Sequence, residues 1–278
     1  MAEVYLELVV ASFIFGSTGV FVKILHLPPT TLTFFRLAIP TLALFLYLFI
    51  KRVRLFRGKN GWMLIASTIN AVRSLLFFIA YTFTTISNAT LAGSIGPVFI
   101  FIYSAIFFKE KITPFKSLLL VMAIAGVFIL YSNQPITLSN KDFLGMSLAL
   151  LSTALYNLTI IIFKKESLKY SPPETIFYQN LLGTFLFLPF LFINKPFPAL
   201  WQLSLVSFSS FLIGVVGFAL YFSALKKVSA AGVSLATFDS VVAVCFGVLI
   251  FKEHLTANMI IGGTLILLAS FLTRKAFD

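Results

Sequence analysis

Two charged residues stand in the middle of long apolar runs of this sequence. Arg73 lies at the centre of residues 61–83, and Asp239 lies at the centre of residues 229–251. On insertion scales a charge at the centre of a membrane-spanning helix costs roughly 2.5–3.5 kcal/mol, so it needs a partner or a function. Arg73 has the geometry to bind a carboxylate through two hydrogen bonds, and Asp239 has the charge to bind an amine. A structural interpretation stays open, in which the two charges neutralise each other as a fixed pair.

Polar aromatic residues inside the apolar runs are the next candidates, because a buried hydroxyl needs a hydrogen-bond partner. These tyrosines are Tyr81, Tyr103, Tyr156, Tyr178 and Tyr221. Tyr156 is followed by Asn157, and the two side chains offer hydrogen bonds to a polar solute. Phenylalanine is too common to be informative, since the chain holds 34 of them. For each tyrosine, packing is the alternative to binding.

Three further residues suit coupling or gating. Glu7, near the start of the first apolar run, either couples transport to a proton or lies at the wet interface without a special role. Arg36 either gates a passage or supports structure by extending its side chain to the interface. Pro97 removes a backbone hydrogen bond, and the freed carbonyl is tolerated where protein or a water-filled cavity satisfies it. We therefore expect a bend around Pro97 that lets two parts of the chain move against each other.

Motifs for other kinds of chemistry are not found. The sequence has no Gly-rich loop followed by Lys and Ser or Thr, so direct use of ATP is not indicated. His26 and His254 are far apart, and with Cys245 as the single cysteine they form no metal-site pattern. No nucleophile–base pair can be recognised. The sequence therefore predicts no enzyme, no metal and no cofactor.

The composition identifies the elements that must position these residues. The chain is 59% hydrophobic and 11% charged, whereas soluble domains carry about 25% charged residues. Apolar runs long enough to cross roughly 30 Å of hydrocarbon as helices recur throughout, and the alternation typical of a β-barrel is missing. We expect an all-α, polytopic membrane protein with ten transmembrane helices. The expected spans are 4–25, 31–50, 61–83, 88–108, 113–132, 143–163, 174–193, 203–225, 229–251 and 256–272.

The net charge of +12 is attributed to orientation in the membrane rather than to nucleic acid. Lys and Arg gather in alternate loops, and the opposite loops hold only Lys141, Lys195 and Lys252. Cytoplasmic loops carry the excess of basic residues. We therefore expect a multi-pass protein of the plasma membrane with both termini in the cytoplasm. Its expected partners are the lipid bilayer and a small-molecule solute, and it is expected to be a monomer or a homodimer.

The sequence contains one stretch twice. Residues 86–113 and 228–256 both begin with small residues and both end in Phe-Lys-Glu and then Thr, at 108–110 and 251–253. We expect a first repeat over 1–132, a connector over 133–142 and a second repeat over 143–278. Because each repeat has five spans, the second must be inverted across the membrane. Inverted repeats place a site near the midplane, between two halves that can open to either side.

At several places the residues match a known family pattern. The matching residues are Phe15, Gly16, Ser17, Lys23, Leu27, Pro28, Pro29, Phe34, Phe35, Arg36, Ser87, Pro97, Val98 and Glu110, with Lys109 where Gly is common. Over essentially its whole length the chain resembles the drug/metabolite transporter superfamily, specifically its EamA type with ten spans. It departs at Asp239 and Ser240, where Pro or Glu-Pro is frequent. The resemblance implies an alternating-access carrier whose cavity is formed mainly by spans 1, 3, 4, 6, 8 and 9, with spans 5 and 10 at the periphery.

Three functions are therefore considered. The first is a secondary transporter that moves a small polar organic solute, an amino acid or related metabolite, by alternating access, with export favoured. The second is an exchanger or importer of a larger metabolite such as S-adenosylmethionine or a sugar phosphate, which Arg73 and Arg36 would suit. The third is an intramembrane enzyme or sensor, for which neither a reactive constellation nor a soluble output domain is recognised.

Overall fold

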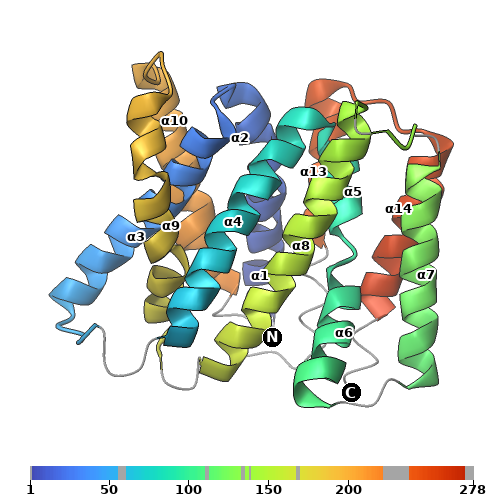
Figure 1. Ribbon diagram of the computed structural model, residues 1–278, viewed down its shortest axis with the longest axis horizontal. Helices are drawn as coiled ribbons and strands as arrows, with labels where there is room; N and C mark the ends of the chain where they lie inside the picture. The colour runs from blue at the N-terminus through green and yellow to red at the C-terminus, as the bar shows by residue number, and fades with distance from the viewer. Residues whose placement is uncertain are drawn as a thin grey trace.

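A computed structural model describes residues 2–55, 61–109, 113–132, 135–137, 139–166, 170–221 and 238–272, and these residues contain helices and no strand (Figure 1). Eight helical segments in this part of the chain are long and apolar enough to cross a membrane, and two shorter apolar helices follow them. The prediction of an all-α, polytopic protein is confirmed.

The first half contains α1 (Ala2–Gly16), α2 (Thr18–Leu25), α3 (Pro29–Ile50), α4 (Gly61–Phe83), α5 (Ile86–Gly93), α6 (Gly96–Phe108) and α7 (Pro114–Tyr131). The second half contains α8 (Lys141–Glu166), α9 (Pro172–Ile193), α10 (Leu200–Phe211), the π-helix η1 (Leu212–Gly217), α13 (Phe238–Phe251) and α14 (Ala257–Leu272). Most predicted spans agree with these helices to within a few residues. The first part of the span expected over 229–251 lies outside the described residues.

The first span is interrupted, which the sequence prediction of one helix over 4–25 did not foresee. The α1 helix ends at Gly16 and α2 begins at Thr18. The hydroxyl groups of Ser17 and Thr18 donate to the carbonyls of Ile14 and Phe15, each at 2.6 Å. Such bonds from a side chain to the preceding turn bend helices.

The fourth span is interrupted where the bend was expected. Ser94 and Ile95 separate α5 from α6, and Pro97 is the second residue of α6. Proline suits the first turn of a helix, where its missing N–H group would have no partner in any case. The break therefore falls just before Pro97, in the middle of the span.

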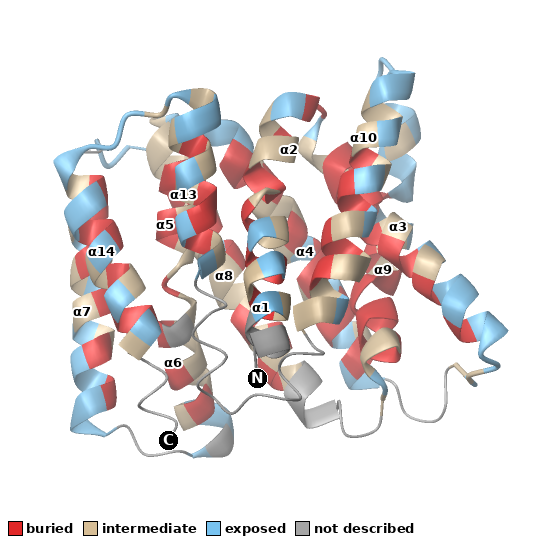
Figure 2. Cartoon of the chain, turned by 180° about the vertical axis from the view of Figure 1, so that it is seen from behind, coloured by how far each residue is buried: buried red, intermediate tan, exposed pale blue. Residues whose placement is uncertain are grey.

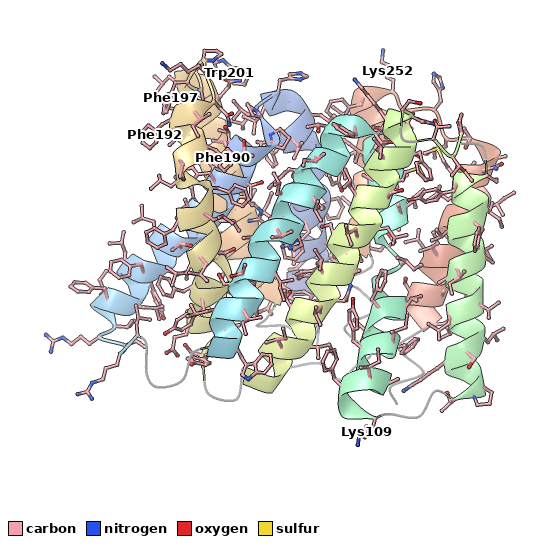
Figure 3. The ribbon with its side chains drawn as sticks, viewed as in Figure 1. Lys109, Phe190, Phe192, Phe197, Trp201 and Lys252 are labelled. Atoms are coloured by element: carbon pink, nitrogen blue, oxygen red, sulfur yellow. The ribbon has the colours of Figure 1, made fainter. Side chains whose placement is uncertain are left out.

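The helix contacts follow an inverted twofold pattern. The α3 helix packs on α9, and α7 packs on α14, so these two pairs join equivalent spans of the two halves. The contact of α4 with α8 has its counterpart in the contact of α1 and α2 with η1 and α10. Lys109 and Lys252, which follow the repeated phenylalanine, lie at opposite ends of the molecule (Figure 3). We call these the Lys109 end and the Lys252 end, and the prediction of inverted repeats is confirmed.

Burial separates a packed interior from an apolar outer surface (Figure 2). Large side chains such as Phe128 and Leu249 are 73% and 76% exposed, as contact with lipid requires. The α7 and α14 helices form one edge of the bundle, where the family resemblance implied that spans 5 and 10 would lie. At the Lys252 end, Phe192, Phe197 and Trp201 point outward from α9, α10 and the turn between them (Figure 3). Such aromatic side chains are typical of the membrane–water interface.

Candidate solute-binding site

Five polar side chains from five different helical segments lie in the interior, each within electrostatic range of at least one other. They are Arg36 on α3, Arg73 on α4, Tyr156 on α8, Tyr221 after η1 and Asp239 on α13, and each is half-buried. The Cζ atom of Arg73 lies 4.5 Å from the centroid of the Tyr156 ring. Electrostatic interactions join Tyr156 to Arg36 and Asp239, and Tyr221 to Tyr156 and Asp239. We call these five residues the central polar group.

Arg73 is held in place on one side only. Its Nε atom donates to Oδ1 of Asn70 at 3.0 Å, and Asn70 in turn donates to the backbone carbonyl of Gln179 at 2.9 Å. The guanidinium lies over the Tyr156 ring, which is a cation–π arrangement. Its terminal Nη atoms donate to no described residue. The end of the side chain that suits a carboxylate is therefore available.

Arg36 lies inside the bundle beside the π-helix. A Cβ atom added at Gly214 would collide with the Pro40 ring and would lie 2.7 Å from Nη1 of Arg36, so the glycine makes room for both Pro40 and the guanidinium. Arg36 and Arg73 repel each other electrostatically, and Arg36 forms no hydrogen bond or ion pair with a described residue. A cavity of about 20 Å³ borders Arg36, Ser209 and Ser210, which is room for about one water molecule. π-Helical turns are frequent at functional sites.

Asp239 faces the first half from α13. One of its carboxylate oxygens, Oδ1, accepts a hydrogen bond from the Ser240 hydroxyl at 3.2 Å. Ser94, in the break between α5 and α6, donates to Ser240 at 2.9 Å. No ion pair joins Asp239 to Arg73, and both residues are described. The interpretation of the two charges as a fixed pair is therefore not the arrangement in this structure.

Tyr81 and Asn157 are two of the remaining residues that the sequence analysis proposed for the site. Tyr81 borders the central polar group, because it interacts electrostatically with Asp239 while its hydroxyl lies 2.9 Å from Oγ1 of Thr90. Asn157 donates to the carbonyl of Thr153 at 2.8 Å and lies against Gly96, at the start of α6.

Tyr103, Tyr178 and Glu7 have other surroundings. Tyr103 donates to the carbonyl of Ala154 at 3.1 Å. Tyr178 is fully buried in a second apolar cluster, where its ring packs against Tyr170 and Phe177. Glu7 is half-buried on α1. The structure thus brings Arg36, Arg73, Tyr156, Tyr221 and Asp239 together, with Tyr81 at their edge, while the contacts given for Tyr103 and Tyr178 lie elsewhere.

Sequence reasoning missed the residues that support the central polar group. Asn70 had a detectable signal, because it stands three residues before Arg73 and therefore shares its helix face. Gln179 and Gly214 had none, because each reaches the group through packing between helices far apart in the sequence. Glu253 was recognised as part of the repeat, but its partner was not.

Glu253 connects the two halves at the Lys252 end. Its Oε1 atom accepts from the backbone N–H of Ile86 at 2.7 Å, and its Oε2 atom accepts from the N–H and hydroxyl of Ser87 at 2.9 and 2.7 Å. These N–H groups begin α5 and have no partner inside that helix. An added Cβ at Gly247 would collide with the carboxylate. Glu253 thus caps a helix of the opposite repeat.

The backbone before Glu253 explains the family preference for glycine. Lys252 has φ 54° and Lys109 has φ 55°, both in the left-handed region that favours glycine. At Lys252 this conformation ends α13 and turns the chain, so that the next residue, Glu253, reaches back toward the bundle. Lysine at both positions indicates that the chain accepts this conformation at some cost in energy.

Further hydrogen bonds join the two halves at the same end. Thr84 donates to Asp142 (2.5 Å), Gln202 to the carbonyl of Leu25 (2.8 Å), Asn194 to Thr30 (2.8 Å), and Asn258 to Ser132 (2.6 Å). We call these bonds and those of Glu253 the Lys252-end junction. It joins the two repeats at that end.

Comparison with known proteins supports the fold and identifies the family of the chain. The chain matches the EamA-like transporter family over residues 3–132 and again over residues 143–274. It is 27% identical to the uncharacterized transporter YoaV of Bacillus subtilis, covering 100% of this chain and 99% of that protein. It is 26% identical to the pseudopaline exporter CntI of Pseudomonas aeruginosa, covering 94% of this chain and 92% of that protein.

A more distant relative and a solved structure extend the comparison. Solute carrier family 35 member G1 of Mus musculus is 23% identical, covering 94% of this chain and 75% of that protein. A crystal structure with 16% sequence identity superposes over the full length of both chains with a TM-score of 0.67, which supports the fold alone. The family match spans both halves of the chain. The chain therefore belongs to the EamA-like transporter family.

Proposed function

We propose that this transporter is a secondary carrier that moves a small polar organic solute, an amino acid or related metabolite, across the plasma membrane by alternating access. The observation that carries the proposal is the central polar group. Its two arginines come from the first half, while Tyr156, Tyr221 and Asp239 come from the second. A solute bound there contacts both halves, so its binding energy can act on their relative position.

The charges of the group suit a solute with an amine and a carboxylate. The open Nη atoms of Arg73 bind the carboxylate, ideally through two parallel hydrogen bonds. Asp239 binds the amine from the opposite half, while the Tyr156 ring fixes the plane of the Arg73 guanidinium. Charge-assisted hydrogen bonds of this kind contribute about 1.5–3 kcal/mol each.

Alternating access requires an interface that can close at either end in turn. The Lys252-end junction supplies the closed end, because side chains of one repeat bind backbone and side-chain groups of the other. Breaking these few bonds lets the halves separate there without unfolding either one. Glu253 caps the start of α5, and the same span is interrupted at the other end of α5, beside Pro97. We expect the span to bend at this interruption.

The distribution of basic residues supports an orientation in the membrane, and one relative supports a direction of transport. The exposed Arg52, Arg54 and Lys109 support a cytoplasmic position of the Lys109 end, because cytoplasmic loops carry the excess of basic residues. The similarity to an exporter over most of both chains favours export. A proton moving in the opposite direction, or the solute gradient itself, supplies the driving force.

A larger anionic solute such as a sugar phosphate is a second candidate. Two neighbouring guanidinium groups without an acidic partner among the described residues favour it. It leaves Asp239 without an amine to bind, which is why the first candidate fits better.

Counterflow in proteoliposomes tests the proposal. The purified protein is reconstituted with an unlabelled amino acid inside, and entry of the labelled amino acid is measured without ATP. We expect transient accumulation above equilibrium that depends on the trapped solute. If a panel of amino acids gives none, while a sugar phosphate does, the second candidate replaces the first.

A further inference from the structure

We infer that the solute is an amino dicarboxylate, with one ammonium group and two carboxylate groups. This inference rests on the proposed function and adds to it the number of charges that the solute must carry. It follows from the charge balance of the central polar group and from the surroundings of Arg36.

The group has one more positive than negative charge. Arg36 and Arg73 each contribute one positive charge, and Asp239 contributes one negative charge. A neutral zwitterion would satisfy Arg73 and Asp239 but would leave Arg36 uncompensated within the membrane interior, which is costly. A solute with net charge −1 balances all three.

Among the side chains that the structure describes, no acidic group other than Asp239 is found near the two guanidinium groups. Asp142, Glu174 and Glu253 accept hydrogen bonds elsewhere, and Glu7 is not among the electrostatic neighbours of Arg36 or Arg73. The other acidic residues, Glu3, Glu110, Glu166 and Asp278, stand at the ends of apolar runs or of the chain. Residues 222–237, which the structure does not describe, contain no Asp or Glu.

Arg36 is placed to receive a ligand rather than to support the fold. It makes no hydrogen bond with a described residue, although a guanidinium has five donors. Gly214 leaves space for its Nη1 atom, and the small cavity beside it is lined mostly by apolar side chains, to which Thr18, Ser209 and Ser210 add hydroxyl groups. An arginine that supported structure alone would be expected to bind carbonyls or acids around it. Arg36 and Arg73 together thus offer two separate anion-binding positions.

Matched acid and amide pairs test the charge count. Aspartate and asparagine, glutamate and glutamine, and 2-aminoadipate with its amide are compared as competitors of counterflow and as ligands that raise the unfolding temperature. We expect at least one acid to bind about 10-fold more tightly than its own amide, since one charge-assisted contact is lost in the amide. Equal affinity within every pair would overturn the inference.

Variants of Arg36 assign the preference to this residue. In Arg36→Gln the acid should lose its advantage while the amide binds as before, and Arg36→Lys should restore part of the advantage. Arg54→Gln, which removes an exposed arginine, is the control and should leave the ratio unchanged. A ratio that is the same in Arg36→Gln and in the native chain would also overturn the inference.

The outcomes separate this inference from the proposed function. If amides are carried as well as acids, the transporter still moves amino acids and only the charge count is wrong. If neither acids nor amides are carried, the proposed solute class fails as well. A phosphate ester that competes better than every amino dicarboxylate would assign the two guanidinium groups to a phosphate instead.

Discussion

The Lys252-end junction and the central polar group are both polar regions between the two repeats, but they differ in how far their hydrogen bonds are satisfied. Glu253 receives three hydrogen bonds from Ile86 and Ser87. Arg36 receives no such support from the described residues, and Asp239 has only its neighbour Ser240. Buried polar groups normally have partners. Where partners are present the region joins the halves, and where they are missing the region is prepared for a solute.

The two regions also differ in which atoms of a charged side chain have hydrogen-bond partners among the described residues. Arg73 is anchored through Nε by Asn70, while its Nη atoms remain available. In the junction, by contrast, both oxygens of Glu253 are occupied. A transporter needs both kinds of contact, because the closing contacts must be complete without the solute and the binding contacts must be incomplete without it.

The largest effect is expected from removing the charge of Asp239. Asp239→Asn keeps the size of the side chain but loses the charge that binds the amine. Loss of a hydrogen bond to a charged group costs about 1.5–3 kcal/mol, so solute affinity should fall roughly 10- to 100-fold. Counterflow measures this fall, and thermal unfolding of the purified variant tests whether folding is kept. Native transport by a normally inserted variant would remove Asp239 from the site.

The next largest effect should come from Glu253→Gln, which weakens the Lys252-end junction. The variant loses the charge that caps α5, and this shifts the equilibrium toward opening at the Lys252 end by about 10-fold, since a charge-assisted bond is weakened. A cysteine at Thr153, in a chain carrying Cys245→Ala, reports access through its rate of alkylation by an impermeant maleimide. We expect faster alkylation from the Lys252 side, with solute affinity nearly unchanged.

Glu110 provides the counterpart of this experiment. It occupies the same position of the repeat as Glu253, and it lies outside the described residues. Sequence symmetry predicts that Glu110→Gln slows alkylation from the Lys252 side, because it weakens closure at the opposite end. If both variants change access in the same direction, Glu253 does not act as a closing contact of one end.

A smaller effect is expected from Tyr156, whose ring lies under Arg73. Tyr156→Phe keeps the ring and should change affinity little, whereas Tyr156→Leu loses a cation–π contact of about 0.5–2 kcal/mol. The expected rise in the half-saturating solute concentration for the leucine variant is therefore roughly 2- to 30-fold. Tyr47→Phe, on the exposed face of α3, is the control. Equal loss in Tyr156→Phe and Tyr156→Leu would mean that the hydroxyl, rather than the ring, matters.

The sequence was sufficient for the spans and the inverted repeats because hydrophobic length and the repeated Phe-Lys-Glu are local signals. It also identified Arg73 and Asp239, since a charge within an apolar run is visible without a structure. It could not show that Gly214 makes room for Arg36, or that Glu253 caps α5, because these contacts join residues more than 150 positions apart. The interruption at Ser17 was missed for a different reason: a hydroxyl that binds the preceding turn leaves the apolar pattern unchanged.

The smallest effect concerns the backbone that delivers Glu253 to α5. Lys252 is held at φ 54°, and the left-handed conformation costs a non-glycine residue roughly 1–2 kcal/mol. Lys252→Gly removes this strain but makes the unfolded chain more flexible, so we expect a net stabilisation of about 0.5–1 kcal/mol in thermal unfolding. Lys195→Gly, at a position without positive φ, should destabilise slightly instead. Because the strain lies in the Lys252 backbone and not in the Glu253 carboxylate, Glu253→Gln should not abolish this gain. A loss of stability in Lys252→Gly would show that the lysine side chain, rather than the backbone conformation, sets the energy of this turn.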